Sequence, residues 1–288
     1  MPAVKSESVD AKNTQKLARL IGISLAGKLE QLKRNWHTRQ PDFDTRFVVC
    51  DDLLPEDAVI GFVDHLPQRD NLVLKSTIRE RKRIGVDIEE YDPIIGEFLM
   101  AFQEPRVLDL ISQITGIEDM VPDPTLYASG ISTMEKDDFL NPHIDNSHDG
   151  NQKKYRVLNL LYYVTPDWRP EYGGNFELWD INVTNPYEIH SKFNRLVIME
   201  TTETSIHSVT PVVADNRRVC VSNYYFADRA ANNHTYRHVT TFTGRPDQPL
   251  RTLALTVIDK YFLNTLSRIA PSLLTRNKHK RKKNVHRE

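Results

Sequence analysis

The first part of the chain carries hydrophobic residues at helical spacing. Within residues 13–35 the apolar positions recur every three or four residues, a pattern typical of an amphipathic helix: Leu17, Leu20, Ile21, Leu25, Leu29 and Leu32. The short apolar run 47–50 predicts a strand. The segment 51–56 follows it with a capping residue and an early proline, which predicts the start of another helix. Residues 91–115 contain two further helical patterns.

From about Thr125 onward, β-rich runs dominate and are separated by Asp, Asn and Gly turns. Residues 156–164 alternate, so that Asn159, Leu161 and Tyr163 share one face of a strand. Residues 218–226 read as a buried strand on which Arg218, Cys220, Ser222 and Tyr224 share a face. Helices first and short strands afterwards predict an α+β fold in which N-terminal helices brace one face of a β-sandwich.

The candidate chemistry lies in a short motif within this β-rich part. His143 and Asp145 stand two residues apart, so on an extended segment both side chains leave the same face. His207 follows 62 residues after Asp145 and would complete a set of two imidazoles and one carboxylate. That set holds Fe(II) on one side and leaves the opposite coordination positions open.

Arg218, 11 residues after His207, adds a second clue. A guanidinium fixed on a buried strand can grip a carboxylate through two hydrogen bonds. No acidic residue shares the inward face of that strand, which fits a partner supplied by a ligand, although a salt bridge to a distant carboxylate is the alternative. An iron triad beside a buried arginine predicts 2-oxoglutarate as co-substrate.

The chain resembles the 2-oxoglutarate/Fe(II)-dependent dioxygenases, in particular their prolyl 4-hydroxylase-like branch. The resemblance runs over roughly residues 125–228 with its segments in the family's order: 141–145, 156–164, 167–168, 173–180, 194–199, 205–209 and 218–226. It implies a double-stranded β-helix, or jelly roll. The expected division is therefore an N-terminal helical region over 1–124, a catalytic core over 125–228, a C-terminal helical extension over 229–275 and a basic tail over 276–288.

The resemblance also implies roles for individual residues. Tyr163 takes the position of a tyrosine whose hydroxyl touches bound 2-oxoglutarate, and Asn159 would line the same pocket. The shared strand register selects Arg218 over its neighbour Arg217 for the distal carboxylate. The hydroxyl of Ser222 could add a second bond to that carboxylate, or Ser222 could be a core serine. The branch carries another tyrosine about ten residues before the first histidine. That position falls near Thr133 here, so the pattern is not met.

The expected reaction oxidises 2-oxoglutarate with O2 to succinate and CO2 while a substrate C–H bond is hydroxylated, with ascorbate as the expected reductant. Asp145 argues against halogenation, because halogenating members lack this carboxylate. The alternative is a metal-binding jelly roll without turnover, acting as a binding or sensor module, for which a buried Arg218 has no use. Prolyl residues, free amino acids and sugar or lipid intermediates all fit as substrates. Selectivity is expected in loops 146–154 and 181–192. Loop 146–154 should be exposed, and His148 within it is a candidate ligand that the assigned histidines make redundant.

Composition narrows the setting. The chain has 288 residues, 39% hydrophobic and 27% charged, which is ordinary for a globular protein. A formal net charge of −1 gives no global attraction to nucleic acid, so no nucleic-acid partner is expected. Two cysteines and no apolar run in residues 1–10 favour a reducing, cytoplasmic setting. Residues 251–269 predict an apolar helix too charged to cross a bilayer. The basic tail 276–287 could make weak contact with an anionic surface, or simply be solvated.

Overall fold

The computed structural model describes residues 4–40 and 43–248. Its helices are α1 (Val4–Gly27), α2 (Leu29–His37), α3 (Glu56–Val63), α4 (Pro93–Ala101) and α5 (Pro105–Thr115). Its strands are β1 (Phe47–Asp51), β2 (Val73–Ser76), β3 (Glu80–Ile84), β4 (Gly130–Met134), β5 (Phe139–Ile144), β6 (Tyr155–Tyr163), β7 (Phe176–Trp179), β8 (Pro186–Ile189), β9 (Arg195–Glu200), β10 (His207–Val209), β11 (Arg218–Ala227) and β12 (Thr241–Phe242).

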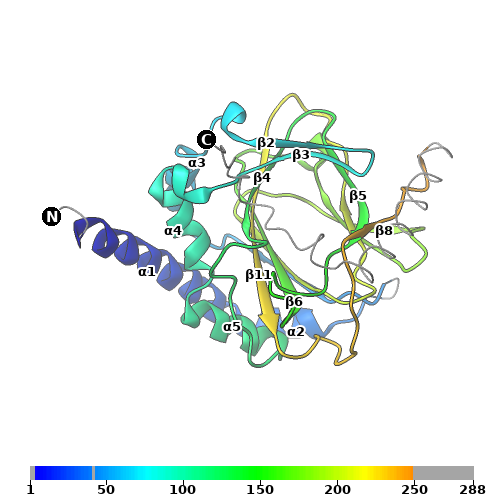
Figure 1. Ribbon diagram of the computed structural model, residues 1–288, viewed down its shortest axis with the longest axis horizontal. Helices are drawn as coiled ribbons and strands as arrows, with labels where there is room; N and C mark the ends of the chain where they lie inside the picture. Colours follow the sequence, from blue (N-terminus) through cyan, green and yellow to red (C-terminus); the bar gives the residue numbers. More distant parts are fainter. Residues whose placement is uncertain (1–3, 41–42, 249–288) are drawn as a thin grey trace, which may run out of the picture.

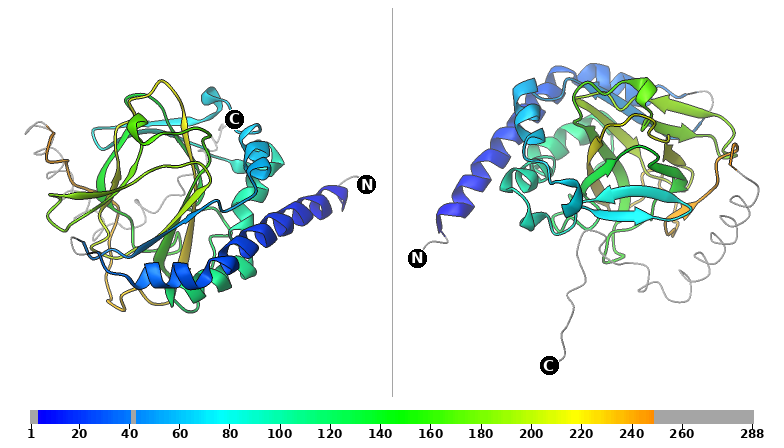
Figure 2. Two further views of the ribbon diagram at one scale, coloured as in Figure 1. Left: turned by 180° about the vertical axis from the view of Figure 1, so that it is seen from behind. Right: turned by 90° about the horizontal axis from the view of Figure 1, so that it is seen from above.

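The strands form one antiparallel sheet that curls into a jelly roll, as expected (Figures 1 and 2). The strand order is β1-β9-β6-β11-β4-β3-β5-β10-β7-β8, with β12 joined to β5 and β2 joined to β3. The order brings β5 and β10, which are about sixty residues apart in sequence, into direct pairing. His143 on β5 and His207 on β10 therefore lie on neighbouring strands.

The helices lie together on one side of the curled sheet, which confirms the predicted bracing layer (Figures 1 and 2). Phe98 of α4 stacks on Phe62 of α3 and on Tyr162 of β6, with ring centroids 4.1 and 5.8 Å apart. These rings are buried and belong to the main hydrophobic core. Burying them between helix and sheet fixes the outer face of β6 and leaves its inner face, with Asn159 and Tyr163, for the interior of the roll.

Some helices begin and end at other residues than the sequence pattern predicted. The helix expected over 13–35 begins earlier and breaks at Lys28, whose ammonium donates to the carbonyls of Asp51, the last residue of β1, and Asp52. Pro55 is the N-cap of α3 and not a residue of its first turn, and no side chain caps that helix. The two helices expected within 91–115 are confirmed as α4 and α5.

Several regions contain more strand than expected. We expected the region 1–124 to be helical apart from the strand 47–50. It also contains the β2–β3 hairpin, and β3 of this hairpin pairs with β4 and β5. The described residues of the expected C-terminal helical extension, 229–248, contain the strand β12 and no helix. Loop 181–192 contains β8. The expected helix 251–269 and the basic tail lie outside the described residues. No helix in the described part of the chain is long and apolar enough to cross a membrane.

Candidate active site

His143, Asp145 and His207 meet inside the jelly roll. His143 on β5 lies directly opposite His207 on β10, and Asp145 follows one residue after the end of β5. One ligand atom from each of the three lies within 4.8 Å of the others, the only such group among the described residues. The Nε2 atoms of His143 and His207 lie 3.8 and 3.7 Å from the carboxylate oxygens of Asp145. The sequence-predicted triad is thus brought together in space.

Hydrogen bonds orient the imidazoles of His143 and His207 for metal binding. The Nδ1 atom of His143 lies 2.9 Å from the carbonyl of Asn141, and that of His207 lies 3.0 Å from the carbonyl of Ser205. A carbonyl only accepts, so each neutral ring carries its proton on Nδ1 and turns the Nε2 lone pair toward the centre. Burial, with a smaller contribution from His207, lowers the pKa of His143 to about 3, and burial also lowers the pKa of His207. Two neutral imidazoles and a carboxylate match the ligands of a facial Fe(II) site.

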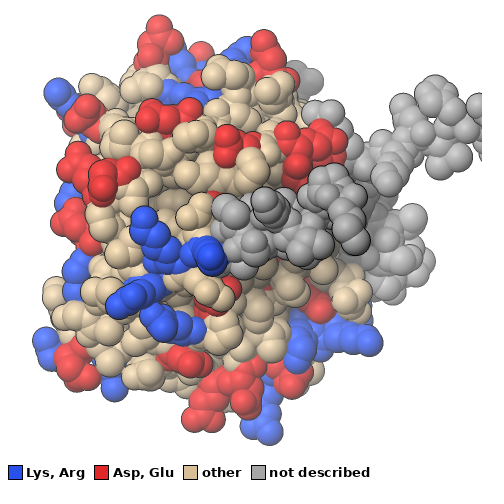
Figure 3. Space-filling model, turned by 90° about the vertical axis from the view of Figure 1, so that its left-hand side faces the viewer, with Lys and Arg blue, Asp and Glu red and all other residues tan. Residues whose placement is uncertain are grey.

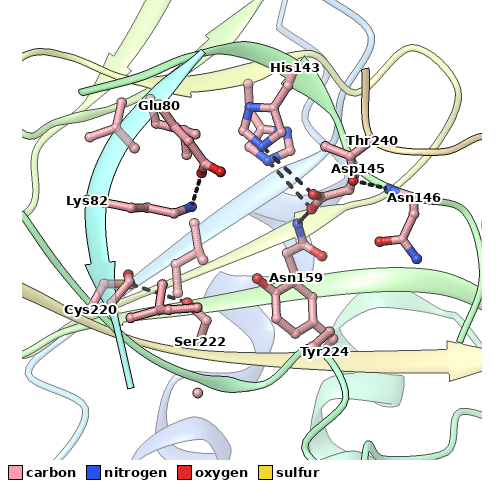
Figure 4. A pocket seen from close by; sticks show the side chains of 18 of the residues that line it. Glu80, Lys82, His143, Asp145, Asn146, Asn159, Cys220, Ser222, Tyr224 and Thr240 are labelled. Carbon is pink, nitrogen blue, oxygen red and sulfur yellow. Dashed lines mark hydrogen bonds and ion pairs between the residues drawn. The ribbon is translucent and has the colours of Figure 1, made fainter. Parts of the chain in front are cut away.

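Two side chains from β6 hold Asp145 in place, and Figure 4 shows one of them, Asn159. The amide of Asn159 donates to Asp145 Oδ2 at 2.7 Å, and Arg156 Nη1 lies 3.0 Å from the same oxygen. Asn159 Oδ1 accepts from the hydroxyl of Thr201 at 3.2 Å. Asn159 therefore lines the cavity as predicted, but the contacts of its amide are with Asp145 and Thr201 and give it a positioning role.

Sequence reasoning missed Arg156. It is buried, it donates to Asn146 Oδ1 at 2.8 Å, and its guanidinium lies 4.3 Å from the ring centroid of Tyr224. Arg156 and Asn159 are three residues apart, so regular alternation would place them on opposite faces. The pairing of β6 with β11 shifts register at Tyr225 and Phe226, and this irregularity lets both side chains reach Asp145.

Arg218 lies in the same cavity of about 370 Å³ as the triad. It is 3% exposed, its Nε donates to Ser191 Oγ at 3.0 Å, and its guanidinium lies 4.7 Å from the ring centroid of Tyr163. No carboxylate in the described part of the chain forms an ion pair with it. Arg217 instead donates to the carbonyl of Pro67 at 3.0 Å. The strand register predicted for Arg218 therefore agrees with the structure.

The wall around Arg218 leaves room for a ligand. The hydroxyl of Tyr163 is buried and makes no well-formed hydrogen bond with the described residues. Gly174 has φ +66°, and a Cβ there would stand 2.8 Å from Arg218 Cδ, so glycine makes space for the arginine. Ser222 lines the cavity, and its hydroxyl oxygen lies 3.7 Å from Cys220 Sγ. Ser191 was missed, because it lies in a loop where no pattern marks it.

The remaining predictions around the cavity have mixed outcomes. Ser132 and Met134 of β4 line the cavity and Thr133 does not, so no tyrosine takes the position expected there. The expectation of an exposed loop 146–154 is wrong for Ser147 and His148, which are buried. His148 hydrogen-bonds with Ser147 and packs on Tyr155, and it is no part of the triad. Its ring lies against the Tyr155 ring, with the ring centroids 4.3 Å apart, and this contact shields it from solvent.

We expect Asn159→Ala to lower Fe(II) affinity by about ten- to a hundredfold with the fold retained, because it removes a partner that orients a ligating carboxylate. Anaerobic titration of the protein with Fe(II) measures this. Thr201→Val is the matched control, since it removes only the bond to Asn159 Oδ1 and should have a smaller effect. Unchanged Fe(II) affinity in Asn159→Ala would contradict the positioning role.

We also expect the metal-free protein to lose stability as the pH falls below about 6.5. The unfolded chain protonates His143 near pH 6.5, whereas the folded pKa of about 3 keeps it neutral, so acid favours the unfolded state. At pH 5 this costs about 2 kcal/mol for His143 alone. Urea unfolding of the chelator-treated protein at pH 7.5 and pH 5 measures it. His143→Gln should lose less stability over the same interval, and an equal loss would contradict the assignment.

Comparison with known proteins places this site in a family. A family model described as 2OG-Fe(II) oxygenase superfamily matches residues 129–226, which include all three triad residues and Arg218. No curated protein sequence matches the chain. Among solved structures, a Pseudomonas putida prolyl-4-hydroxylase is 17% identical, with 70% of this chain and 98% of that chain covered and a TM-score of 0.51.

Two further structures show the same fold. A Trichoplax adhaerens prolyl hydroxylase, solved with a peptide fragment of the hypoxia inducible factor oxygen degradation domain, is 20% identical, with coverage of 74% and 92% and a TM-score of 0.50. A prolyl 4-hydroxylase from Phytophthora capsici is 15% identical, with coverage of 87% and 78% and a TM-score of 0.50. Through residues 129–226, this chain matches the 2-oxoglutarate/Fe(II)-dependent oxygenase superfamily, and its site is that of a dioxygenase that uses Fe(II) and 2-oxoglutarate.

Proposed function

We propose that the protein hydroxylates a C–H bond of a small-molecule or protein substrate while 2-oxoglutarate is oxidised to succinate and CO2. One observation carries the proposal. A closely spaced set of two neutral imidazoles and a carboxylate shares one cavity with a buried arginine that has no carboxylate partner among the described residues. A jelly roll that only binds a metal has no use for such an arginine, because an uncompensated buried cation costs free energy.

The residues divide the work. His143, Asp145 and His207 would hold the iron, which supplies the redox chemistry with O2 when it is bound. Arg218 would bind the distal carboxylate of 2-oxoglutarate through two charge-assisted hydrogen bonds. The Tyr163 hydroxyl, which burial keeps protonated by raising its pKa, would donate to the same carboxylate. Asn159 and Arg156 hold the Asp145 carboxylate in position.

Other pocket residues take lesser roles in the proposal. The hydroxyls of Ser191 and Ser222 lie on the wall that carries Arg218, and Ser191 fixes its Nε. The buried surroundings of the triad exclude bulk water from the reacting atoms, which protects the oxidising chemistry from side reactions. Ascorbate would serve as the reductant that restores Fe(II) after turnovers without substrate.

The test is turnover without a prime substrate. Purified protein with Fe(II), 2-oxoglutarate and O2 should release succinate and CO2 in equal amounts, and ascorbate should sustain the rate. Omitting Fe(II), or replacing 2-oxoglutarate with glutarate, should abolish the release. A protein that binds Fe(II) and 2-oxoglutarate but forms no succinate under these conditions would instead be a binding or sensor module.

A further inference from the structure

The cavity around the proposed iron site is cationic, although the chain as a whole has a formal net charge of −1. Two carboxylates line it, Glu80 and Asp145. Six cationic side chains line it with them: Lys75, Arg79, Lys82, Arg156, Arg218 and Arg237. A bound Fe(II) ion and a 2-oxoglutarate dianion would cancel each other's charge. The cationic side chains that line the cavity therefore still outnumber its carboxylates once both are bound.

This excess is local. On the face of the molecule in Figure 3, acidic and basic side chains are interspersed. In the cavity, each carboxylate already pairs with one cation. Asp145 pairs with Arg156 at 3.0 Å, and Glu80 pairs with Lys82 at 3.0 Å. The cavity thus concentrates positive potential, and its low-dielectric walls strengthen attraction for anions.

The β2–β3 hairpin shows the excess most clearly. Lys75 of β2 and Lys82 of β3 are direct cross-strand partners and both line the cavity. Like charges directly opposite each other on one face of a sheet destabilise the pairing. In Figure 4, Lys82 extends from β3 into the cavity, where Glu80 reaches it. Lys75 has no carboxylate partner among the described residues. Glu80 therefore balances the charge of Lys82, and no described carboxylate balances the charge of Lys75.

Arg237 adds a further cation at the rim. Its side chain is exposed, and its Nη2 donates to Gln152 Oε1 at 2.8 Å. Both residues line the cavity, and no described carboxylate pairs with Arg237. Gln152 comes from loop 146–154, where the sequence predicted substrate selection. The Gln152 amide is neutral, so it orients the Arg237 guanidinium without neutralising the positive charge of that group.

We propose that the prime substrate is a small molecule with a carboxylate or phosphate group, which Lys75, Lys82 and Arg237 attract and bind beside the iron site. This inference rests on the proposed function and deepens it. A cavity of about 370 Å³ lies near the lower end of small-molecule sites, so it fits 2-oxoglutarate together with a group the size of an amino acid or a sugar phosphate. The anion supplies the charge that the lysine pair lacks.

Matched pairs of small molecules test this proposal. The probes are N-acetyl-L-proline and its amide, N-acetyl-L-leucine and its amide, and glucose 6-phosphate and glucose. Binding to the protein loaded with Fe(II) and 2-oxoglutarate is measured by anaerobic calorimetry. In at least one pair, the anionic member should bind about tenfold or more tightly than its neutral partner. The carboxylate and phosphate pairs separate the two anion types.

Charge-reversal variants then locate the preference. Lys75→Glu and Arg237→Glu should each reduce it by about tenfold, whereas Lys136→Glu, an exposed lysine on the β4–β5 turn outside the cavity, should leave it unchanged. Equal binding of neutral and anionic members, or no binding of any probe, overturns the proposal, as does a preference that survives both reversals. Succinate formation without any probe is measured in parallel. Its absence contradicts the proposed function, whereas its presence without an anion preference contradicts only this inference.

Discussion

Replacing Arg218 with alanine is expected to raise the KM for 2-oxoglutarate by roughly 30-fold to several thousand-fold while Fe(II) affinity stays near normal. The guanidinium is buried, lies over the Tyr163 ring and has no described carboxylate partner, so its proposed partner is the distal carboxylate of the co-substrate. Losing a charge-assisted bidentate contact in a partly desolvated pocket costs about 2–5 kcal/mol. Succinate formation over a range of 2-oxoglutarate concentrations measures the KM, and Fe(II) titration measures the metal affinity.

Two companion variants make the Arg218 result specific. Arg218→Lys should fall between wild type and alanine, because an ammonium keeps the charge but loses the planar fork. Arg217→Ala is the neighbouring control, since its side chain contacts Pro67 outside the cavity. If Arg217→Ala weakens 2-oxoglutarate binding and Arg218→Ala does not, another residue holds the co-substrate.

His143→Ala and His207→Ala are each expected to remove Fe(II) binding and succinate formation together, with losses well over a hundredfold. Loss of a group that merely orients a ligand costs about ten- to a hundredfold, and loss of the ligand itself costs more. The fold should persist, because these side chains line a cavity and the main hydrophobic core lies elsewhere, between the helices and the outer face of the sheet. Equilibrium dialysis with Fe(II), succinate release and thermal unfolding separate the three effects.

His148→Ala is the control for these two variants. His148 is a nearby histidine that packs on Tyr155 and lies outside the triad, so Fe(II) binding should survive its removal. Succinate release at the wild-type rate in either triad variant would show that another residue ligates the iron.

Much of the site could be predicted from the sequence, because strand alternation is a local property. Side chains two residues apart share a face whatever the strand packs against. This parity correctly grouped Asn159 with Tyr163, and Arg218 with Cys220, Ser222 and Tyr224, on the walls of one cavity. It also separated Arg218 from Arg217, whose contact is with Pro67.

The contacts that escaped prediction depend on irregular or distant geometry. Arg156 reaches Asp145 because the β6–β11 pairing shifts register, and one strand's alternation contains no sign of that shift. Ser191 meets Arg218 from a loop 27 residues away. In the β2–β3 hairpin, β2 has only four residues and β3 is mostly charged, so neither strand shows the apolar alternation that marks a strand.

The sequence by itself determined the ligand types, the faces of the strands around them and the helices that brace the sheet, because spacing along one element sets which side chains share a face. Only the tertiary structure decided what those faces meet. It paired β5 with β10 to close the triad, set Arg156 and Asn159 against Asp145, and placed Lys75 opposite Lys82 at the cavity. Such contacts join residues far apart in the chain, and the pairing of whole strands fixes them.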